Sequence, residues 1–375
     1  MRSVMTSMTS ALVVACASLA VWACQGEVLD LGGDAGQATA PLPLTDAAPD
    51  SVTDGGTGSA TDAVAGNLTD AAIGPPTVVP GPAALANSSA LDADAPGAPG
   101  GNLFDSDAVG MVRHIFAVRS DDGSLMQLTF GGTADQEPAV SPDGSTVVFS
   151  SNRSADDSFQ LYALDMAASS VKQLTAQTGG AGQPTFSPDG TTIAYHSGYA
   201  LWLMAADGSN ARQLVDSQAG PGSGGYEHAA FTPDGKTIVV DRENEIDGFD
   251  RNGQNEISIV ENGTQDELYP AISPDGTFVA FVASCNAPGD ANVMIATMAT
   301  PGAPACSART WNAPTWGVVS HPSWGPAAWI AFAHLSSNGL HRVAISDENQ
   351  QVFDMVEDQG DQLDPSWAPS TFNLN

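Results

Sequence analysis

The sequence predicts an all-β protein, a six-bladed β-propeller, because one short phrase recurs six times along the chain. The first four copies are complete and end in Ser-Pro-Asp-Gly or Thr-Pro-Asp-Gly. The fifth and sixth copies are shorter and have the pattern Pro-Ser-Trp-x-Pro. Successive copies lie 41 to 52 residues apart, the length of a four-stranded propeller blade. The copies occupy residues 137–144, 183–190, 228–235, 269–276, 321–326 and 364–369.

Each full copy predicts a strand, a tight turn and a second strand. Proline presets φ near about −65° at the first turn position, and glycine takes the left-handed conformation that closes a hairpin. Short runs that are apolar at nearly every position are typical of strands covered on both faces, as in a blade held between two neighbours. Such runs follow the first five copies at residues 146–150, 192–196, 237–241, 278–282 and 329–333.

Further strands complete each blade, for example residues 201–204 and 211–215, which Asp207-Gly-Ser-Asn210 joins. This phrasing resembles the TolB-like family of WD-repeat-like propellers over residues 113–375. The resemblance implies the fold and leaves the function open, because the same units occur in binding scaffolds, peptidase gating domains and some lyases. A low-complexity segment stands where TolB has a separate globular N-terminal domain, which puts a Tol-system role in doubt.

The two ends of the chain are expected to share the sixth blade. Residues 114–119 and 125–129 look like the outer two strands of a blade, and residues 364–369 with 371–374 look like the inner two. Joining them closes the ring and leaves no exposed sheet edge. The propeller is therefore expected to cover residues 113–375 with closure by the termini.

Residues 1–24 are typical of an export signal, with Arg2 before an apolar core that is too short to span a bilayer. Val21-Trp-Ala-Cys24 resembles a bacterial lipobox, in which Cys24 is lipidated. Cys16 fits the same pattern less well, and a plain cleaved signal is the alternative. By resemblance to Gram-negative lipoprotein sorting, Gln25 after the cysteine implies an outer-membrane anchor.

Residues 25–112 are expected to form a disordered acidic tether. The segment has no lysine or arginine, one aromatic residue (Phe104), and a background of Ala, Gly, Pro, Thr, Ser and Asp. Such a composition buries too little surface to offset the entropy of ordering. The alternative is a small domain that the pattern does not reveal.

The net charge of −32, from 43 acidic and 11 basic residues, excludes nucleic-acid partners and binding to anionic lipid. Contact with a membrane is expected only through the N-terminal lipid. The acidity suits solubility of an exported protein better than a specific role in binding cations.

Cys285 and Cys306 are the two cysteines outside the signal. In an oxidising compartment they predict a disulfide, worth about 3 kcal/mol in the chain-entropy model. The expected strands place them at opposite ends of the sheet unless the loops curl back, and bridged Cα atoms lie within about 7 Å. No histidine lies near either cysteine in sequence, so a metal site is not indicated.

The first residue of each phrase is expected at one mouth of the central channel, where loops on a rigid scaffold often carry recognition. All six are polar, and they are candidates for ligand binding; a hydrated ring that binds nothing is the alternative. Resemblance to propeller lyases that hold a metal near the channel makes cation binding by this ring another alternative. The six residues are Glu137, Gln183, His228, Tyr269, His321 and Asp364.

The third blade is expected to carry a long acidic loop from Asp241 to Glu256. Its oxygen-bearing side chains are spaced somewhat like those of a calcium loop. An ordinary loop between two strands of the family's unit is the alternative. Ca²⁺ is the one cofactor that the sequence suggests for this loop. The possible ligands are Asp247, Asp250, Asn252 and Glu256.

These patterns together predict a non-catalytic lipoprotein of the cell envelope, monomeric, whose propeller binds an envelope protein or a glycan. A polysaccharide lyase or hydrolase acting at the channel is the alternative. Nucleophilic catalysis finds no support, because residues 220–225 have proline where a Gly-x-Ser-x-Gly elbow needs its first glycine.

Overall fold

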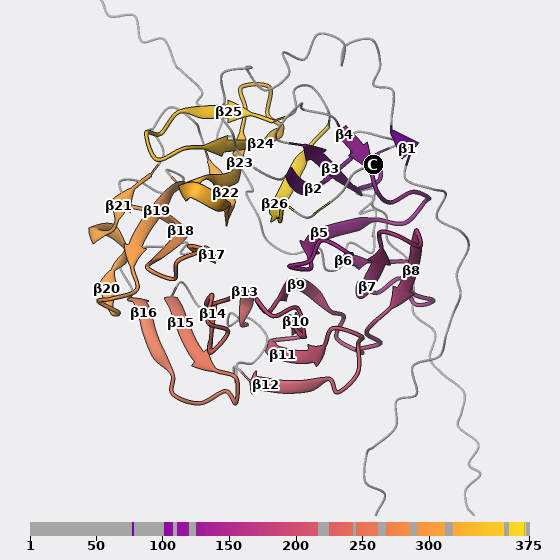
Figure 1. Ribbon diagram of the computed structural model, residues 1–375, viewed down its shortest axis with the longest axis horizontal. Helices are drawn as coiled ribbons and strands as arrows, with labels where there is room; N and C mark the ends of the chain where they lie inside the picture. The colour runs from indigo at the N-terminus through magenta and orange to yellow at the C-terminus, as the bar shows by residue number, and fades with distance from the viewer. Residues whose placement is uncertain are drawn as a thin grey trace, which may run out of the picture. The chain divides into compact units, whose positions relative to one another are not determined.

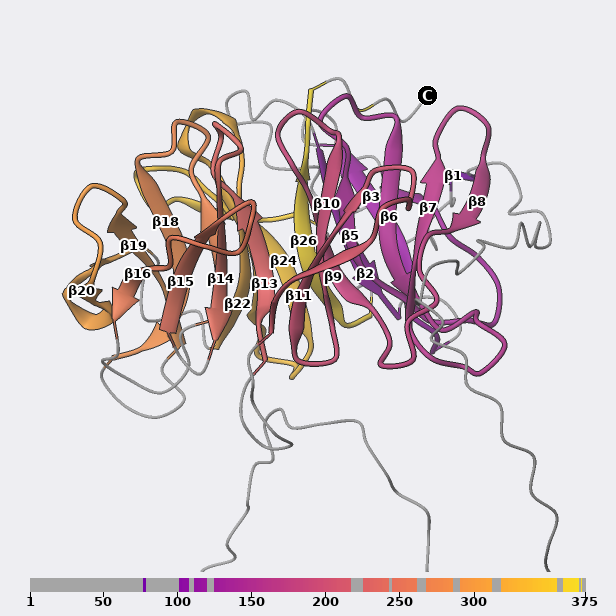
Figure 2. The same ribbon diagram turned by 90° about the horizontal axis from the view of Figure 1, so that it is seen from below.

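The computed structural model confirms the six-bladed propeller (Figure 1). All described residues lie within a compact unit spanning Ala63–Asn375. Six sheets surround a central axis, and the strands of each sheet run roughly along that axis (Figure 2). The described residues are 77–78, 101–107, 111–119, 125–216, 225–242, 245–261, 268–285, 291–311, 318–355, 360–370 and 372.

Each blade begins with an inner strand at the channel and continues outward. Blades 1 to 3 contain, in that order, β5 (Asp135–Val140), β6 (Thr146–Ser151), β7 (Gln160–Asp165) and β8 (Ser170–Gln173); β9 (Gly182–Phe186), β10 (Thr192–Ser197), β11 (Ala200–Ala205) and β12 (Arg212–Asp216); β13 (Glu227–Phe231), β14 (Thr237–Arg242), β15 (Glu245–Asp250), β16 (Ile257–Glu261) and β20 (Ala303–Pro304).

Blades 4 to 6 contain, in the same order, β17 (Leu268–Ile272), β18 (Phe278–Ser284), β19 (Ala291–Thr297) and β21 (Arg309–Thr310); β22 (Val319–Trp324), β23 (Ile330–Leu335), β24 (His341–Ser346) and β25 (Val352–Asp354); β26 (Gln362–Ala368), β2 (Gly101–Ser106), β3 (His114–Arg119), β4 (Leu125–Gln127) and β1 (Thr77–Val78). Two short 3-10 helices are described, η2 (Ala305–Ser307) and η3 (Pro326–Ala328).

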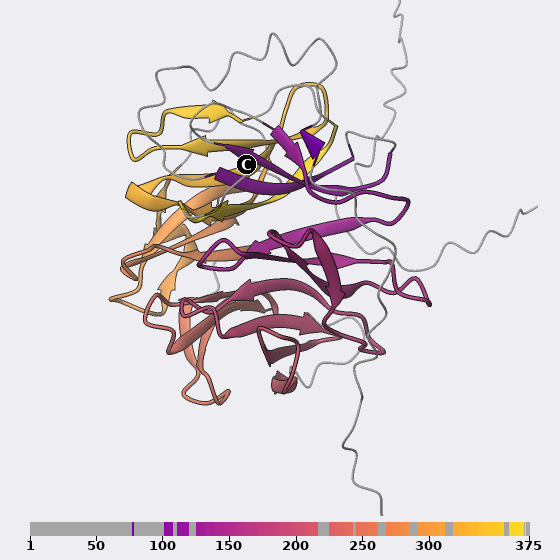
Figure 3. The same ribbon diagram turned by 45° about the vertical axis from the view of Figure 1, so that its right-hand side comes forward.

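The termini close the ring as predicted, but with a different division of strands. C-terminal β26 is the innermost strand of blade 6, and it pairs with N-terminal β2, for example Leu103 with Ser366 (Figure 3). The second strand therefore comes from residues 101–106, and not from 371–374. The expected start of the propeller at residue 113 is too late, because β2 and the short β1 both precede it.

The sequence did not predict β2, because Gly101–Ser106 has only two large apolar residues, Leu103 and Phe104. Both are almost fully buried, at 0% and 1% exposure, and they face opposite sides of the blade. Leu103 packs against blade 1, and Phe104 packs against blade 5. A six-residue strand between two blades thus needs little apolar sequence of its own.

The core consists of six hydrophobic clusters, one at each interface between neighbouring blades. Successive side chains of a strand point to opposite faces. In β10, Ile193 and Tyr195 pack toward blade 1, whereas Ala194 between them packs toward blade 3. This two-sided burial explains why the second strands of blades 1 to 5 are apolar at consecutive positions.

The repeated turns have the predicted geometry. In the first, the Gly144 N–H donates to the Ser141 carbonyl at 2.8 Å, and Gly144 has φ 75°. The Asp143 carboxylate accepts hydrogen bonds from the Ser141 hydroxyl and the Ser145 N–H, which lowers its pKa to about 2. Gly190, Gly235 and Gly276 have φ between 67° and 73° in the equivalent turns.

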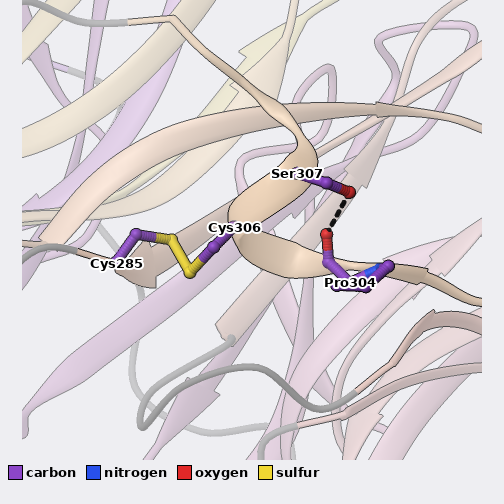
Figure 4. The surroundings of a disulfide bond; sticks show 4 residues. All are labelled: Cys285, Pro304, Cys306 and Ser307. Carbon is purple, nitrogen blue, oxygen red and sulfur yellow. Dashed lines mark hydrogen bonds between the residues drawn. A yellow bond between two sulfur atoms is a disulfide. The ribbon is translucent and has the colours of Figure 1, made fainter.

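The predicted disulfide is present, with 5.4 Å between the Cα atoms of Cys285 and Cys306 (Figure 4). After β19 the chain crosses to blade 3, where β20 pairs in parallel with β16, and then turns through η2. This excursion brings Cys306 to the end of β18, so the sheet geometry that argued against the bridge does not apply. The disulfide ties the crossing segment to blade 4.

Residues 1–76, which include the signal, Cys24 and most of the expected tether, lie outside the described residues. In the part of the chain that the structure describes, no helix has the length and apolar character needed to cross a membrane.

Deleting residues 362–375 should unfold the whole propeller, because it removes the inner strand of blade 6, which contributes to two blade interfaces. We expect a loss of more than about 4 kcal/mol in the free energy of unfolding. Urea denaturation followed by circular dichroism measures it, and a chain lacking only residues 373–375 is the control. A cooperative transition at the wild-type midpoint would contradict closure by β26.

Candidate functional site

The six residues predicted at the channel share one unusual backbone conformation. Each has a positive φ, between 45° and 65°. A left-handed conformation costs a non-glycine residue roughly 1–2 kcal/mol, and it persists only where the surrounding structure imposes it. We call Glu137, Gln183, His228, Tyr269, His321 and Asp364 the channel ring.

The cause is a β-bulge in every inner strand. In blade 1, Gln136 pairs with Ser150 and Ala139 with Val148, so β5 has one more residue than β6 over this stretch. The same shift in register occurs at the ring residue of each of the other five blades. Bulges of this kind redirect a side chain out of the regular alternation.

The ring forms the floor of a pocket of about 310 Å³ on the propeller axis. In each blade the lining begins with the ring residue and continues along the inner strand toward the following turn. Pro188, which belongs to a Ser-Pro-Asp-Gly turn, is the outermost lining residue, so the pocket opens on the face that carries these turns.

One half of the ring is connected by hydrogen bonds between neighbouring blades. The Gln183 N–H donates to Glu137 Oε2 at 2.8 Å, and the Gln183 side-chain oxygen accepts the His228 N–H at 3.1 Å. The Gln183 amide nitrogen therefore faces His228 Nε2, at 2.7 Å. Because that amide donates, His228 Nε2 accepts, and Nδ1–H points to Asp241 at 3.0 Å.

The other half is held by edge-on and tilted contacts between rings and by an ion pair. The Tyr269 ring lies 4.2 Å from the His228 ring and 3.8 Å from the His321 ring, measured between centroids. His321 Nε2 lies 2.6 Å from Asp364 Oδ1. The structure thus brings all six predicted residues together, and each has a defined orientation.

Behind the ring stand three titratable residues that sequence reasoning missed, Asp105, His196 and Asp241. Each lies on the second strand of its blade, opposite the residue that precedes the ring residue. His196 and Asp241 end the apolar runs 192–196 and 237–241, whereas Val282 and Ala333 end the corresponding runs of blades 4 and 5. A titratable residue at the fifth position of an apolar run was therefore the sequence signal for His196 and Asp241.

Gly182 is required where these two layers meet. A Cβ at this position would lie 2.8 Å from both Glu137 Oε2 and His196 Cε1. The absence of a side chain lets the Glu137 carboxylate approach the backbone of blade 2 and reach the Gln183 N–H.

The two carboxyl groups of the ring have opposite pKa shifts. Burial, together with the nearby negative charge of Asp364, raises the pKa of Glu137 to about 7. Burial also acts on Asp364, but the ion pair with His321 outweighs it and holds the pKa of Asp364 well below its usual range. Near neutral pH the site therefore exchanges a proton at Glu137, while Asp364 stays charged.

The imidazoles also differ. Burial lowers the pKa of His196 to about 4, so His196 is neutral. For His228, burial acts in the same direction, but the Asp241 carboxylate overcomes it and raises the pKa of His228. Protonation of His228 would place a donor at Nε2 opposite the Gln183 amide donor, and turning the amide over would oppose its NH2 group to the His228 backbone N–H.

The proposed calcium loop is largely a strand. Residues Glu245–Asp250 form β15, in which Ile246 and Phe249 are buried at interfaces with the neighbouring blades. Asp247 is buried, and Arg242 Nη2 lies 3.2 Å from its carboxylate and 3.5 Å from Glu256. A guanidinium thus occupies the place between these two acids.

The remaining two candidates lie in the turn after β15. The Asp250 carboxylate accepts hydrogen bonds from the Asn252 and Gln254 N–H groups and from the Asn255 side chain. This is an ordinary turn cap, and it uses the oxygens that a cation would need. Over the described ranges no group of three or more His, Cys, Asp or Glu side chains is placed to hold a metal ion.

The geometry defines the class of protein as a closed six-bladed propeller with a pocket on its axis. The family described as TolB beta propeller domain matches residues 83–219 and 136–247. A comparison with curated protein sequences finds no match.

Solved structures show the same fold at low sequence identity. TolB from Acinetobacter baumannii has 18% identity and a TM-score of 0.61, over 73% of this chain and 68% of that chain. The putative TolB from Agrobacterium tumefaciens has 18% identity and a TM-score of 0.55, over 73% and 94%. Hydrazine synthase from Kuenenia stuttgartiensis has 12% identity and a TM-score of 0.58, over 74% and 48%.

The family match and the solved structures agree with the TolB-like β-propeller that the repeated phrase predicted. At these identities the likeness to solved structures shows the fold alone, and it includes a synthase as well as TolB. The function must therefore be argued from the pocket.

The raised pKa of Glu137 should make stability depend on pH. The folded protein holds this proton up to about pH 7, whereas the unfolded chain releases it near 4.5. The contribution is complete below pH 4.5 and is lost as the pH rises through 7, up to about 3 kcal/mol in all. Glu137→Gln should remove this part of the pH dependence, as measured by urea denaturation across that range.

Glu348→Gln, at an exposed turn, is the matched control. Subtracting the two profiles cancels the other acids that titrate in the same window, such as Asp247. Identical pH profiles for the two variants would show that Glu137 has no shifted pKa.

Proposed function

We propose that the protein is a non-catalytic binding scaffold, whose propeller recognises a partner of the cell envelope through the axial pocket. One observation carries the proposal: six polar side chains from six blades converge on one preformed pocket, and each is held there by a strained bulge. Preorganised polar groups beneath apolar walls are the usual composition of a binding site. The TolB-like fold itself suggests a protein-binding role.

We further propose that the protein is exported and anchored at the outer membrane by a lipid on Cys24, and that it is monomeric. The sequence of residues 1–24 supports export and the lipobox supports the anchor. The Cys285–Cys306 disulfide agrees with an oxidising compartment such as the periplasm. A glycan is the second kind of partner that such a location would offer.

A polysaccharide lyase or hydrolase is the second candidate. The opposite pKa shifts of Glu137 and Asp364 favour it, because acid and base pairs in active sites are set apart in this way. The volume of about 310 Å³ argues against it, being at the lower end for ligand pockets and small for a sugar chain. Release of new sugar ends from envelope glycans by the purified protein would favour the enzyme over the binding scaffold.

Filling the pocket should abolish partner binding. Ala230 and Ala271 line its wall, so Ala230→Trp and Ala271→Trp should each occlude it. We expect at least a tenfold loss, about 1.4 kcal/mol, in affinity for a partner captured from envelope extracts by the wild-type chain. Surface plasmon resonance measures the affinity.

The control is Ala155→Trp, an equal change of volume in the exposed turn between β6 and β7, on the opposite face of the propeller. All three variants should keep the wild-type circular dichroism spectrum. Unchanged partner affinity in both pocket variants would refute recognition through the pocket.

The anchor is tested separately. Cys24→Ala should move the protein from the membrane fraction to the soluble fraction, because the signal alone would no longer supply a lipid. Mass spectrometry of the mature N-terminus checks for the acyl chains. Cys16→Ala is the control, since Cys16 fits the lipobox less well, and retention of the Cys24→Ala protein in membranes would rule out this anchor.

A further inference from the structure

The floor of the pocket holds two carboxyl groups and two imidazoles. Glu137 and Asp364 both line it, and the charge of Asp364 disfavours ionisation of Glu137. Asp105 lies directly behind Asp364, and burial and the Asp364 charge raise the pKa of Asp105 well above its usual value. Carboxyl groups that raise one another's pKa in this way are stabilised by a cation placed between them.

Among the described residues that line the pocket, the basic side chains are His228 and His321. No lysine or arginine is present among the described residues that line it. The Arg113 guanidinium is hydrogen-bonded to Asp105 and Asp361, behind the ring, and the Arg251 guanidinium lies over the ring of Phe231 in the wall. His321 is paired with Asp364, and His228 is bonded to Gln183 and Asp241, which leaves Glu137 without a basic partner of its own.

The walls above this floor are mostly apolar, with Thr185, Ser323 and Ser366 as polar members. Five of the six residues that follow the ring residues are prolines, and four large apolar side chains stand nearer the opening. A volume of about 310 Å³ suits one long side chain better than an extended ligand. The larger apolar lining residues are Phe186, Phe231, Ile272 and Trp324.

We infer that the pocket receives a single alkylammonium or alkylguanidinium group, the lysine or arginine side chain of a protein partner. The alkyl part would lie between the proline walls, and the charged end would reach Glu137 and Asp364. This inference rests on the proposed function and names the chemistry of the partner at that same site.

The face around the opening supports a basic partner. The repeated turns place four exposed aspartates on this face, and hydrogen bonds within each turn lower their pKa values to about 2, so they are charged at neutral pH. Lys236 and Arg251 offset two of them. Such a field attracts cationic partners and repels phosphate or acidic glycans. The four are Asp143, Asp189, Asp234 and Asp275.

Binding should be linked to protons through Glu137. The groups that face its carboxyl are the Gln183 N–H, the imidazoles of His228 and His196, and the carboxylates of Asp364 and Glu227. A cation placed between Glu137 and Asp364 stabilises the ionised form, so the bound complex should release a proton near pH 7. A merely apolar pocket would release none.

The test uses the full chain and short blocked peptides, acetyl-Gly-Gly-X-Gly-Gly-amide, with X as lysine, arginine or norleucine. We expect lysine or arginine to bind at least about tenfold more tightly than norleucine in titration calorimetry, because norleucine has no charge for the acidic floor. Titration in two buffers of different ionisation enthalpy should show proton release near pH 7.

Glu137→Gln should weaken binding of the cationic peptides about tenfold and abolish the proton release, while leaving norleucine unaffected. Glu348→Gln, distant from the pocket, should change neither quantity. Equal binding of all three peptides, no binding of the cationic ones, or unchanged binding by Glu137→Gln would each overturn the inference.

The outcomes separate this inference from the proposed function. If Ala230→Trp abolishes capture of a partner but the cationic peptides do not bind, the proposed scaffold function is supported and the inference of a basic side chain is contradicted. If the cationic peptides bind with proton release but no partner depends on the pocket, the inferred chemistry of the pocket is supported and the proposed scaffold function is contradicted.

Discussion

The pairing of β26 with β2 is the interaction on which the rest of the molecule depends. Every blade buries both faces against its neighbours, so an open array would leave two apolar faces in water. Closing the ring covers them with strands from the two ends of the described chain. Closure also restrains the inner strands, which allows six non-glycine residues to keep a left-handed conformation at the axis.

The chemistry of the pocket arises from contacts between blades. Glu137 bonds to the backbone of blade 2, and its proton affinity reflects the charge of Asp364 in blade 6. His228 is oriented from one side by Gln183 of blade 2 and from behind by Asp241 of its own blade. The hydrogen bonds and charges that act on these ring residues therefore come from more than one blade. This arrangement explains why repetition of one phrase can produce six chemically different positions.

The fold limits what can be concluded about function, because propellers of this kind include a synthase as well as TolB. The pocket narrows the question. Its volume suits one side chain, its walls are mostly apolar, and its floor holds two carboxyl groups, of which only Asp364 is paired with a histidine. These properties favour recognition of a basic protein segment over turnover of a polysaccharide.

The repeated phrase by itself determined the number of blades, the turns and the six ring positions, because turn chemistry and strand period act locally. The cysteine pair was also predicted from the sequence, although its geometry depended on the excursion of β20. Only the tertiary structure revealed β2, since six weakly apolar residues become a strand when two blades cover them. It alone showed that Asp105, His196 and Asp241 stand behind the ring, and that Arg242 separates Asp247 from Glu256. Proton affinity and pairing depend on groups that are close in space and far apart in sequence.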